Sequence, residues 1–152
     1  MAVHKIVEHP DPILKEKAVA VKEITPQILR LIRNMFDTMY AAKGIGLAAP
    51  QIGVSKRVIV VDVENSPMAL INPEITFFAG RESGTEGCLS IPGYWGEVER
   101  ARTVEVKALN PDGEQVVVKA EGYMARALQH EIDHLDGILF IDRATKIGLE
   151  KK

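Results

Sequence analysis

The chain has 152 residues, of which 46% are hydrophobic and 26% are charged, and its formal net charge is -2. This length and balance indicate one compact domain over residues 1–152 with a substantial apolar core. Acidic and basic residues are interspersed, so the sequence has no basic patch for nucleic acid or for a membrane surface. No apolar run approaches the ~20 residues that cross a bilayer, and residues 1–10 lack the apolar stretch of a signal peptide. We therefore expect a cytoplasmic protein.

The first expected helix covers residues 26–43. Thr25 fits an N-cap, and Pro26 fits the first helical position, where its missing N–H costs nothing. Gly44 is placed to end the helix. The apolar residues between these ends recur at helical spacing: Ile28, Leu29, Leu31, Ile32, Met35, Phe36 and Met39. We interpret this face as core packing.

Glycine and alanine dominate the next segment, residues 44–53. Such small residues let the backbone approach another group closely. The segment lacks the Gly-Lys-Ser/Thr ending of a phosphate-binding loop and follows a helix instead of a strand, so a nucleotide site is not expected. Two interpretations remain open at this point: a tight connection between a helix and a strand, or a loop that faces a substrate.

Strand signals follow. Residues 57–63 are rich in β-branched side chains, and residues 69–73 predict a short strand that 74–78 can extend. Residues 103–109 and 115–121 flank the turn sequence Asn-Pro-Asp-Gly and predict an antiparallel hairpin.

Near the end of the chain, residues 138–141 predict a last short buried strand, and the polar residues from about 143 predict a loosely held tail. Together with the helices, these segments predict an α+β fold. We expect antiparallel strands packed around a central helix, with another helix near the N-terminus.

That central helix is expected from about Gly122 to Gly137 and carries the pattern H-E-x-x-H. Residues four apart lie on one helix face, so His130 and His134 present two imidazoles to one point, as a divalent metal requires. Glu131 can reach a metal-bound water without itself binding the metal. The alternative is a helix with two solvated surface histidines.

A catalytic site of this kind needs a third protein ligand. Downstream, Phe140 stands where a metzincin has its third histidine. The other candidates lack a suitable spacing or a fixed scaffold: His4, His9, Asp136, Asp142 and Glu150. Cys88 is the only cysteine and lies in a strand-like piece between turn residues. By elimination and ligand chemistry we infer a Cys-His-His set with one free vertex. A lone cysteine is otherwise a small buried hydrophobe.

Three segments together resemble the signature motifs of the peptide deformylases, in the same order. They are residues 44–51 (GIGLAAPQ), 86–90 (EGCLS) and 129–134 (QHEIDH). The resemblance covers residues 6 to about 143. It implies a single deformylase domain that removes the N-formyl group from the formyl-methionine of nascent polypeptides and releases formate.

The resemblance also implies roles for individual residues. Cys88, His130 and His134 match the metal ligands, usually of Fe²⁺, which Zn²⁺, Ni²⁺ or Co²⁺ can replace. Glu131 matches the general base, which then acts as general acid. The side-chain amide of Gln51 and the backbone N–H of Leu89 match the groups that hold the developing oxyanion.

Other matches concern the substrate and the surroundings of the ligands. Ile45 and Gly46 match positions that pair with the bound peptide like an added strand. Glu86 and Arg100 match an ion pair that braces the cysteine segment; a solvated pair worth ~0–1 kcal/mol is the alternative. Asp133 is expected to support a ligand histidine.

The methionine pocket is expected to include one face of the metal helix, and Trp95, which differs from the residue in many relatives, is expected at its rim. The residues expected on that face are Tyr123, Arg126, Ala127 and His130. Some relatives dock on the ribosome through a longer basic C-terminal helix, for which residues 146–152 are short, so ribosome contact is only weakly expected.

Two other classes share part of this pattern. A general endopeptidase has the H-E-x-x-H helix, but this chain lacks the downstream ligand. A metal-stabilised binding protein without catalysis would need neither Gln51 nor Glu131, and both are present.

Overall fold

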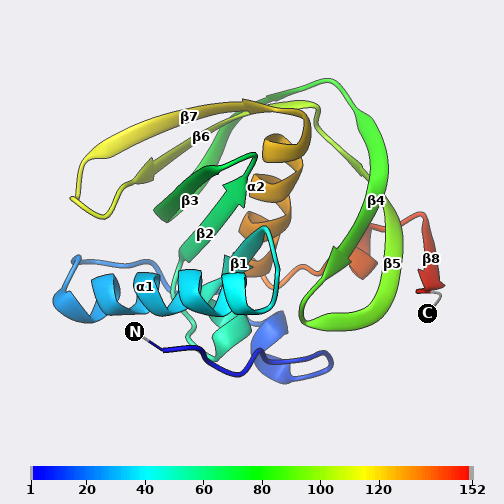
Figure 1. Ribbon diagram of the computed structural model, residues 1–152. Coiled ribbons are helices and arrows are strands. Elements are labelled where there is room, and N and C mark those ends of the chain that lie inside the picture. Colours follow the sequence, from blue (N-terminus) through cyan, green and yellow to red (C-terminus); the bar gives the residue numbers. More distant parts are fainter. Residues whose placement is uncertain (1, 151–152) are drawn as a thin grey trace.

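A computed structural model describes residues 2–150 and contains two antiparallel sheets with a helix between them (Figure 1). The larger sheet has the order β1-β2-β3-β6-β7, and the smaller has the order β4-β5-β8. The strands of the larger sheet are β1 (Gly46–Ala48), β2 (Val58–Val63), β3 (Ser66–Ala79), β6 (Thr103–Leu109) and β7 (Gln115–Glu121). Those of the smaller sheet are β4 (Glu82–Cys88), β5 (Ile91–Arg100) and β8 (Lys146–Leu149).

Three α-helices accompany the sheets in the described residues: α1 (Pro26–Ala41), α2 (Gly122–Leu135) and the single turn α3 (Phe140–Arg143). Short 3-10 turns lie at η1 (Pro12–Lys15) and η2 (Ala49–Ile52). The expected α+β fold with a central helix is confirmed. None of the helices in residues 2–150 is long and apolar enough to span a membrane.

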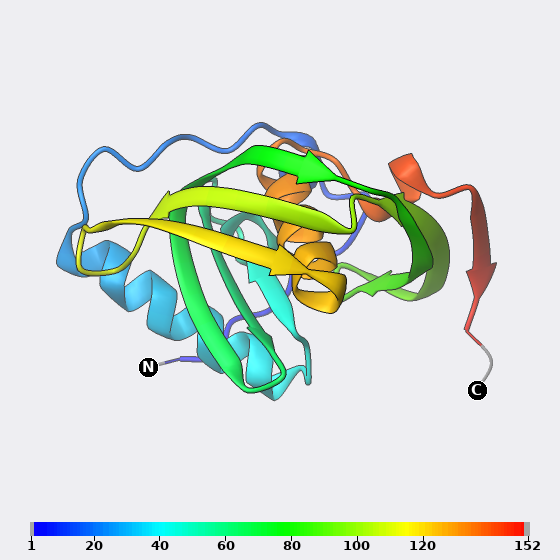
Figure 2. The same ribbon diagram turned by 90° about the horizontal axis from the view of Figure 1, so that it is seen from above.

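Strand β2 of the larger sheet is buried on both faces. Alternate side chains of a strand point to opposite faces. Ile59 and Val61 pack with Leu128 and Ile132 of α2, whereas the neighbouring β2 residues pack with α1. A strand covered on both faces needs an unbroken apolar run, which the sequence Val-Ile-Val-Val supplies. The two helices therefore lie on opposite sides of this sheet, and α2 is held from one side by it (Figure 2).

The smaller sheet covers the remaining side of α2 and has a core of its own. Leu14, Ile91, Val98, Leu139 and Phe140 form this buried cluster, against which Cys88 packs. Strand β4 ends at Cys88, where a tight connection leads into β5. Cys88 therefore belongs to the smaller sheet, whereas α2 packs on the larger sheet.

The predicted boundaries of α1 agree well with the structure. Oγ of Thr25 accepts a hydrogen bond from the backbone N–H of Ile28 at 3.3 Å, and Pro26 is the first helical residue. The helix ends at Ala41, and the left-handed residue after it is Lys43 instead of the expected Gly44. The predicted hairpin is confirmed as β6 and β7. The short strand predicted over 69–73, with its extension over 74–78, is part of the longer strand β3, which is irregular at Asn72, where φ is +54°.

The predictions for the last part of the chain are wrong. Residues 138–141 do not form a strand, because Phe140–Arg143 forms the turn α3. The carboxylate of Asp142 accepts the backbone N–H of Leu139 at 2.9 Å and thereby closes that turn. The tail expected from about residue 143 instead includes β8, which pairs with β5 from Lys146 to Leu149. Residues 151–152 lie outside the described part.

Candidate metal centre and substrate cavity

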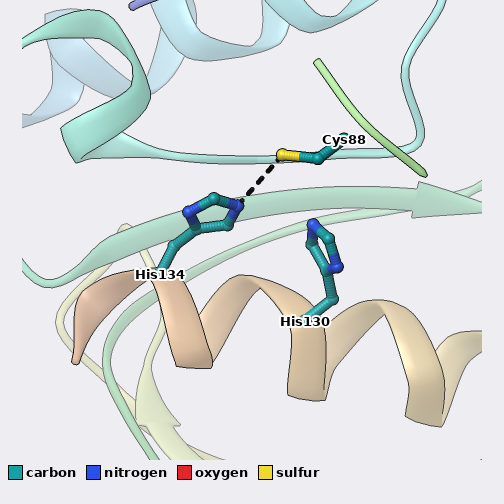
Figure 3. Close-up of side chains that lie close together, drawn as sticks. All are labelled: Cys88, His130 and His134. Atoms are coloured by element: carbon teal, nitrogen blue, oxygen red, sulfur yellow. Dashed lines mark hydrogen bonds between the residues drawn. The ribbon is translucent and has the colours of Figure 1, made fainter. Parts of the chain in front are cut away.

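Two distant segments of the chain bring Cys88, His130 and His134 together (Figure 3). The two histidines lie one turn apart on α2, and Sγ of Cys88 is 3.3 Å from Nε2 of His134. One donor atom of each residue lies within 4.8 Å of the other two. Such a cluster of one sulfur and two imidazole nitrogens fits a tetrahedral divalent metal with one position left for water or substrate.

The ring of His130 is oriented by Glu86. Its Nδ1 lies 2.8 Å from Oε1 of Glu86, so Nε2 is the nitrogen free for a metal. The ring also stacks on Phe140 of α3, with ring centroids 6.3 Å apart. A hydrogen bond from the second ring nitrogen to a carboxylate fixes the tautomer and orientation of a metal-binding histidine. His134 differs, because its Nδ1 is buried and has no hydrogen-bond partner in residues 2–150.

Glu86 accepts four hydrogen bonds. Besides His130, Nε and Nη2 of Arg100 bind its two oxygens at 2.8 Å each, and Nη1 of Arg126 binds at 2.6 Å. Burial would raise the pKa of this carboxyl, but the hydrogen bonds from Arg100 and His130 hold the pKa well below its usual range. The side chains of Glu86 and Arg100 are 5% and 4% exposed. The expected pair is therefore present, and it is buried instead of solvated.

Asp133 does not contact a ligand histidine, contrary to the prediction. Its Oδ2 accepts hydrogen bonds from Arg100 and from Arg143, both at 2.6 Å, and Oδ1 accepts a second bond from Arg143 at 3.0 Å. Successive helical residues differ by about 100° in direction, so a neighbour of His134 points elsewhere. The carboxylate that contacts a ligand histidine is instead Glu86, which lies beside His130.

Glu131 extends into the same region from the helix. Its side chain is buried, and Oε1 has no hydrogen-bond partner among the described residues. Burial raises the pKa of this carboxyl to about 7, an effect that the charge of His130 partly opposes. A carboxyl with a pKa close to neutral can take up and release a proton under working conditions.

Gln51 reaches the cluster from η2 and is 1% exposed. Its Oε1 accepts the backbone N–H of Ala48 at 2.9 Å, which fixes the amide so that Nε2 points the other way. Nε2 donates to Oγ of Ser90 at 3.0 Å and lies 3.6 Å from Sγ of Cys88. An oriented amide N–H therefore stands directly beside the proposed ligand sulfur.

A cavity of about 290 Å³ contains these groups. Its lining comes from all three segments identified in the sequence and from residues near them: Lys43, Gly44, Ile45, Gly46, Gln51, Thr85, Glu86, Gly87, Cys88, Leu89, Tyr123, Arg126, Ala127, His130 and Glu131. The four residues expected in the methionine pocket are among them. Trp95 is not, because its ring lies against Gly148 of β8.

Strand β1 forms one wall of this cavity and has a free edge. Among the described residues it pairs with β2 alone, and it is the outermost strand of its sheet. Ile45, just before it, is 51% exposed. A Cβ on Gly46 would collide with Oε2 of Glu131, so only glycine lets β1 pass this close to the acid. Segment 44–53 is thus both a tight connection and a wall of the cavity.

Several supporting residues could not be recognised from the sequence. Ser90 lies in the quoted motif 86–90, but no local pattern indicates its contact with Gln51, 39 positions away, or that of Arg143 with Asp133, 10 positions away. Arg126 was expected only as pocket lining, although its spacing of four from His130 places both on one helix face. That spacing could have indicated a shared partner.

The polypeptide deformylase family matches residues 3–150 of the chain. A peptide deformylase of Carboxydothermus hydrogenoformans is 63% identical over 147 residues, which cover 97% of each chain. One from Desulforudis audaxviator is 60% identical over 154 residues, which cover 100% of each chain. The crystal structure of the peptide deformylase from Thermotoga maritima has a TM-score of 0.92 at 44% identity, covering 95% of this chain and 99% of that one. That of Synechococcus elongatus, in complex with actinonin, has a TM-score of 0.90 at 44% identity, covering 93% and 78%.

Proposed function

The chain belongs to the peptide deformylase family, and from this premise we propose which of its residues carry out the reaction. Peptide deformylases are metal-dependent hydrolases that remove the N-formyl group from the formyl-methionine of nascent polypeptides. Water and the formyl amide give formate and a free amine. The assignment below rests on the cavity that joins Gln51, Cys88, His130 and Glu131.

Sγ of Cys88 and Nε2 of His130 and His134 are the proposed metal ligands. The donor set suits Fe²⁺ and equally Zn²⁺, Ni²⁺ or Co²⁺, since thiolate and imidazole accept all four. We propose Fe²⁺ as the native metal on the resemblance to the family. Because a thiolate can be oxidised, the protein is best prepared without oxygen.

A bound divalent metal would lower the pKa of a coordinated water molecule and polarise the formyl oxygen. Glu131 takes the proton of the attacking water and delivers it to the leaving nitrogen, whose bond to the formyl carbon breaks. The pKa of about 7 suits a group that must do both. Nε2 of Gln51 and the backbone N–H of Leu89 donate hydrogen bonds to the oxygen on which negative charge develops.

The substrate is proposed to bind along β1. The free edge of that strand at Ile45 and Gly46 offers backbone groups to an extended peptide. The methionine side chain then enters the cavity between Tyr123, Arg126 and Ala127. Small residues in β1 let the peptide come close to Glu131.

The observation that supports this assignment best is the buried Glu131 carboxyl with one unpaired oxygen, beside three clustered metal donors. Glu131→Gln keeps the shape of the side chain and removes the base. We expect formate release from a formyl-methionyl peptide to fall ~10²–10⁴-fold, with the metal retained. Glu121→Gln, an exposed substitution just before α2, serves as the control and is expected to keep the wild-type rate. If wild-type protein loaded anaerobically with Fe²⁺ released no formate, the assignment would be wrong.

We further propose that the chain acts as a single domain in the cytoplasm, or in an organelle matrix if its source is organellar. Residues of α2 and of the larger sheet form one hydrophobic core, and this supports the proposal of a single domain. Contact with the ribosome stays a prediction. Residues 146–149, which such contact would engage, already pair with β5.

A further inference from the structure

A continuous chain of ion pairs leads from the surface turn α3 to the ring of His130. Arg143 binds Asp133 with two hydrogen bonds, at 2.6 and 3.0 Å. Asp133 accepts Nη1 of Arg100 at 2.6 Å, and Arg100 binds both oxygens of Glu86 at 2.8 Å. Glu86 then holds Nδ1 of His130 at 2.8 Å. Three segments of the chain are joined in this way: β4–β5, α2 and α3.

We propose that Arg143 is a positioning residue for the metal, acting on His130 through this chain. The inference rests on the proposed role of His130 as a metal ligand. It gives a role to a residue of α3, the turn that was not predicted from the sequence. Arg143 itself touches neither the metal site nor the substrate cavity.

The physical reason is that Arg100 is shared between two carboxylates. The side chains of Arg100, Glu86 and Asp133 are 4%, 5% and 12% exposed, so each charge depends on its protein partners. Arg143 supplies two of the three hydrogen bonds that Asp133 accepts. Without them, Asp133 would rely on Arg100 alone and draw its guanidinium away from Glu86. Glu86 would then hold the ring of His130 less firmly.

The position of Arg143 allows its head group to be removed without dismantling α3. The turn is fixed by the buried side chains of Leu139 and Phe140 and by the Asp142 cap. The side chain of Arg143 is 46% exposed and borders a second cavity of about 420 Å³, which Asp133 and Arg100 also line. A small cation can therefore reach Asp133 from solvent once the guanidinium is gone.

Arg81 provides a matched control. It lines the same second cavity and also forms an ion pair, with Glu99 at 3.2 Å, but this pair is exposed and has no connection to Glu86. If Arg143 were only another surface ion pair, it would contribute ~0–1 kcal/mol to stability and nothing to metal binding. Both arginines would then behave alike.

The test measures Co²⁺ binding to Arg143→Ala, Arg143→Lys, Arg81→Ala and wild type, by competition with a chelator and by the absorption bands of thiolate-bound Co²⁺. We expect Arg143→Ala to bind Co²⁺ roughly 3–10-fold more weakly with altered bands, below the 10–100-fold typical of direct ligand partners. Arg143→Lys keeps the charge without the paired donors, so its Co²⁺ affinity should lie between those of Arg143→Ala and wild type. Guanidinium chloride at ~20 mM, far below denaturing concentrations, should restore binding in Arg143→Ala and leave Arg81→Ala unchanged.

Several results would overturn the inference. If Arg143→Ala bound Co²⁺ like wild type, or if Arg81→Ala weakened binding equally, Arg143 would not position the ligand. If wild type itself bound no Co²⁺ with thiolate bands, the proposed metal site would fail first, and this inference with it. If circular dichroism shows that Arg143→Ala does not fold, the Co²⁺ affinities of Arg143→Lys and wild type are compared instead. Equal affinities would contradict the proposal.

Discussion

The two sides of the Cys88–His130–His134 cluster are held in place by different interactions. On the side toward β4, β5 and α3, buried charges surround His130, with Glu86 and Arg100 at their centre. On the side toward β1, no charge network exists among the described residues. There, backbones approach closely: a Cβ on Gly44 would lie 2.8 Å from Cδ1 of Leu89, and one on Gly46 would collide with Glu131.

This difference indicates that one side serves metal binding and the other serves hydrolysis. Charges fix the direction of a ring, which is what a metal ligand needs, because hydrogen bonds are directional. Close packing fixes the distance between the substrate strand and the reacting groups, which is what hydrolysis needs. Substitutions on the charged side should therefore change metal affinity and stability. Those on the packed side should change the rate with the metal retained.

The largest effect is expected from Glu86→Gln, which removes the carboxylate at the centre of the charged side. Breaking these buried pairs leaves Arg126 without a carboxylate partner among the described residues and Arg100 with Asp133 alone, so we expect a loss of ~3–5 kcal/mol in unfolding free energy. Urea unfolding measures this, and elemental analysis should show a lower metal content after dialysis. Glu82→Gln, an exposed change on the same strand, is the control. A loss below ~1 kcal/mol, as for surface pairs, would contradict the idea that buried charges hold this side.

The next effect concerns the packed side. Gly46→Ala places a Cβ against Oε2 of Glu131, whose flexible end can move at little cost in stability. Displacing the acid by about 1 Å should lower kcat ~10²-fold with the metal and the melting temperature retained. If the effect passes through Glu131, Gly46→Ala should cost little more in a Glu131→Gln background. Equal losses in both backgrounds would mean that Gly46 acts on substrate binding instead.

The sequence predicted the local patterns of the site better than its long-range contacts. The helical spacing of His130 and His134 and the small residues around Gly46 are local patterns, so they can be recognised within a few residues. The hairpin β6–β7 and the start of α1 were predicted for the same reason. The contact of Glu86 with His130 joins residues 44 positions apart, and no local pattern indicates it.

The C-terminal errors have the same cause. A short apolar run such as residues 138–141 fits a strand or a helix equally well, and the Asp142 cap with its partner Lys15 decides for α3. Strand β8 exists because β5 offers it an edge. Asp133 was assigned to a histidine from closeness in sequence, whereas its actual partners, Arg100 and Arg143, come from β5 and α3.

The smallest effect is expected from Ser90→Ala, which tests how the packed side orients the side-chain amide of Gln51. Oγ of Ser90 accepts Nε2 of Gln51 at 3.0 Å in a fully buried position, while the amide oxygen stays fixed by Ala48. Losing one buried hydrogen bond of ~1–1.5 kcal/mol should lower kcat by up to ~10-fold. The metal content should stay as in wild type, because Cys88, His130 and His134 keep their surroundings. A drop in metal content larger than the drop in rate would show instead that Ser90 and Gln51 serve the ligand sulfur, 3.6 Å away, and the division between the two sides would not hold at this point.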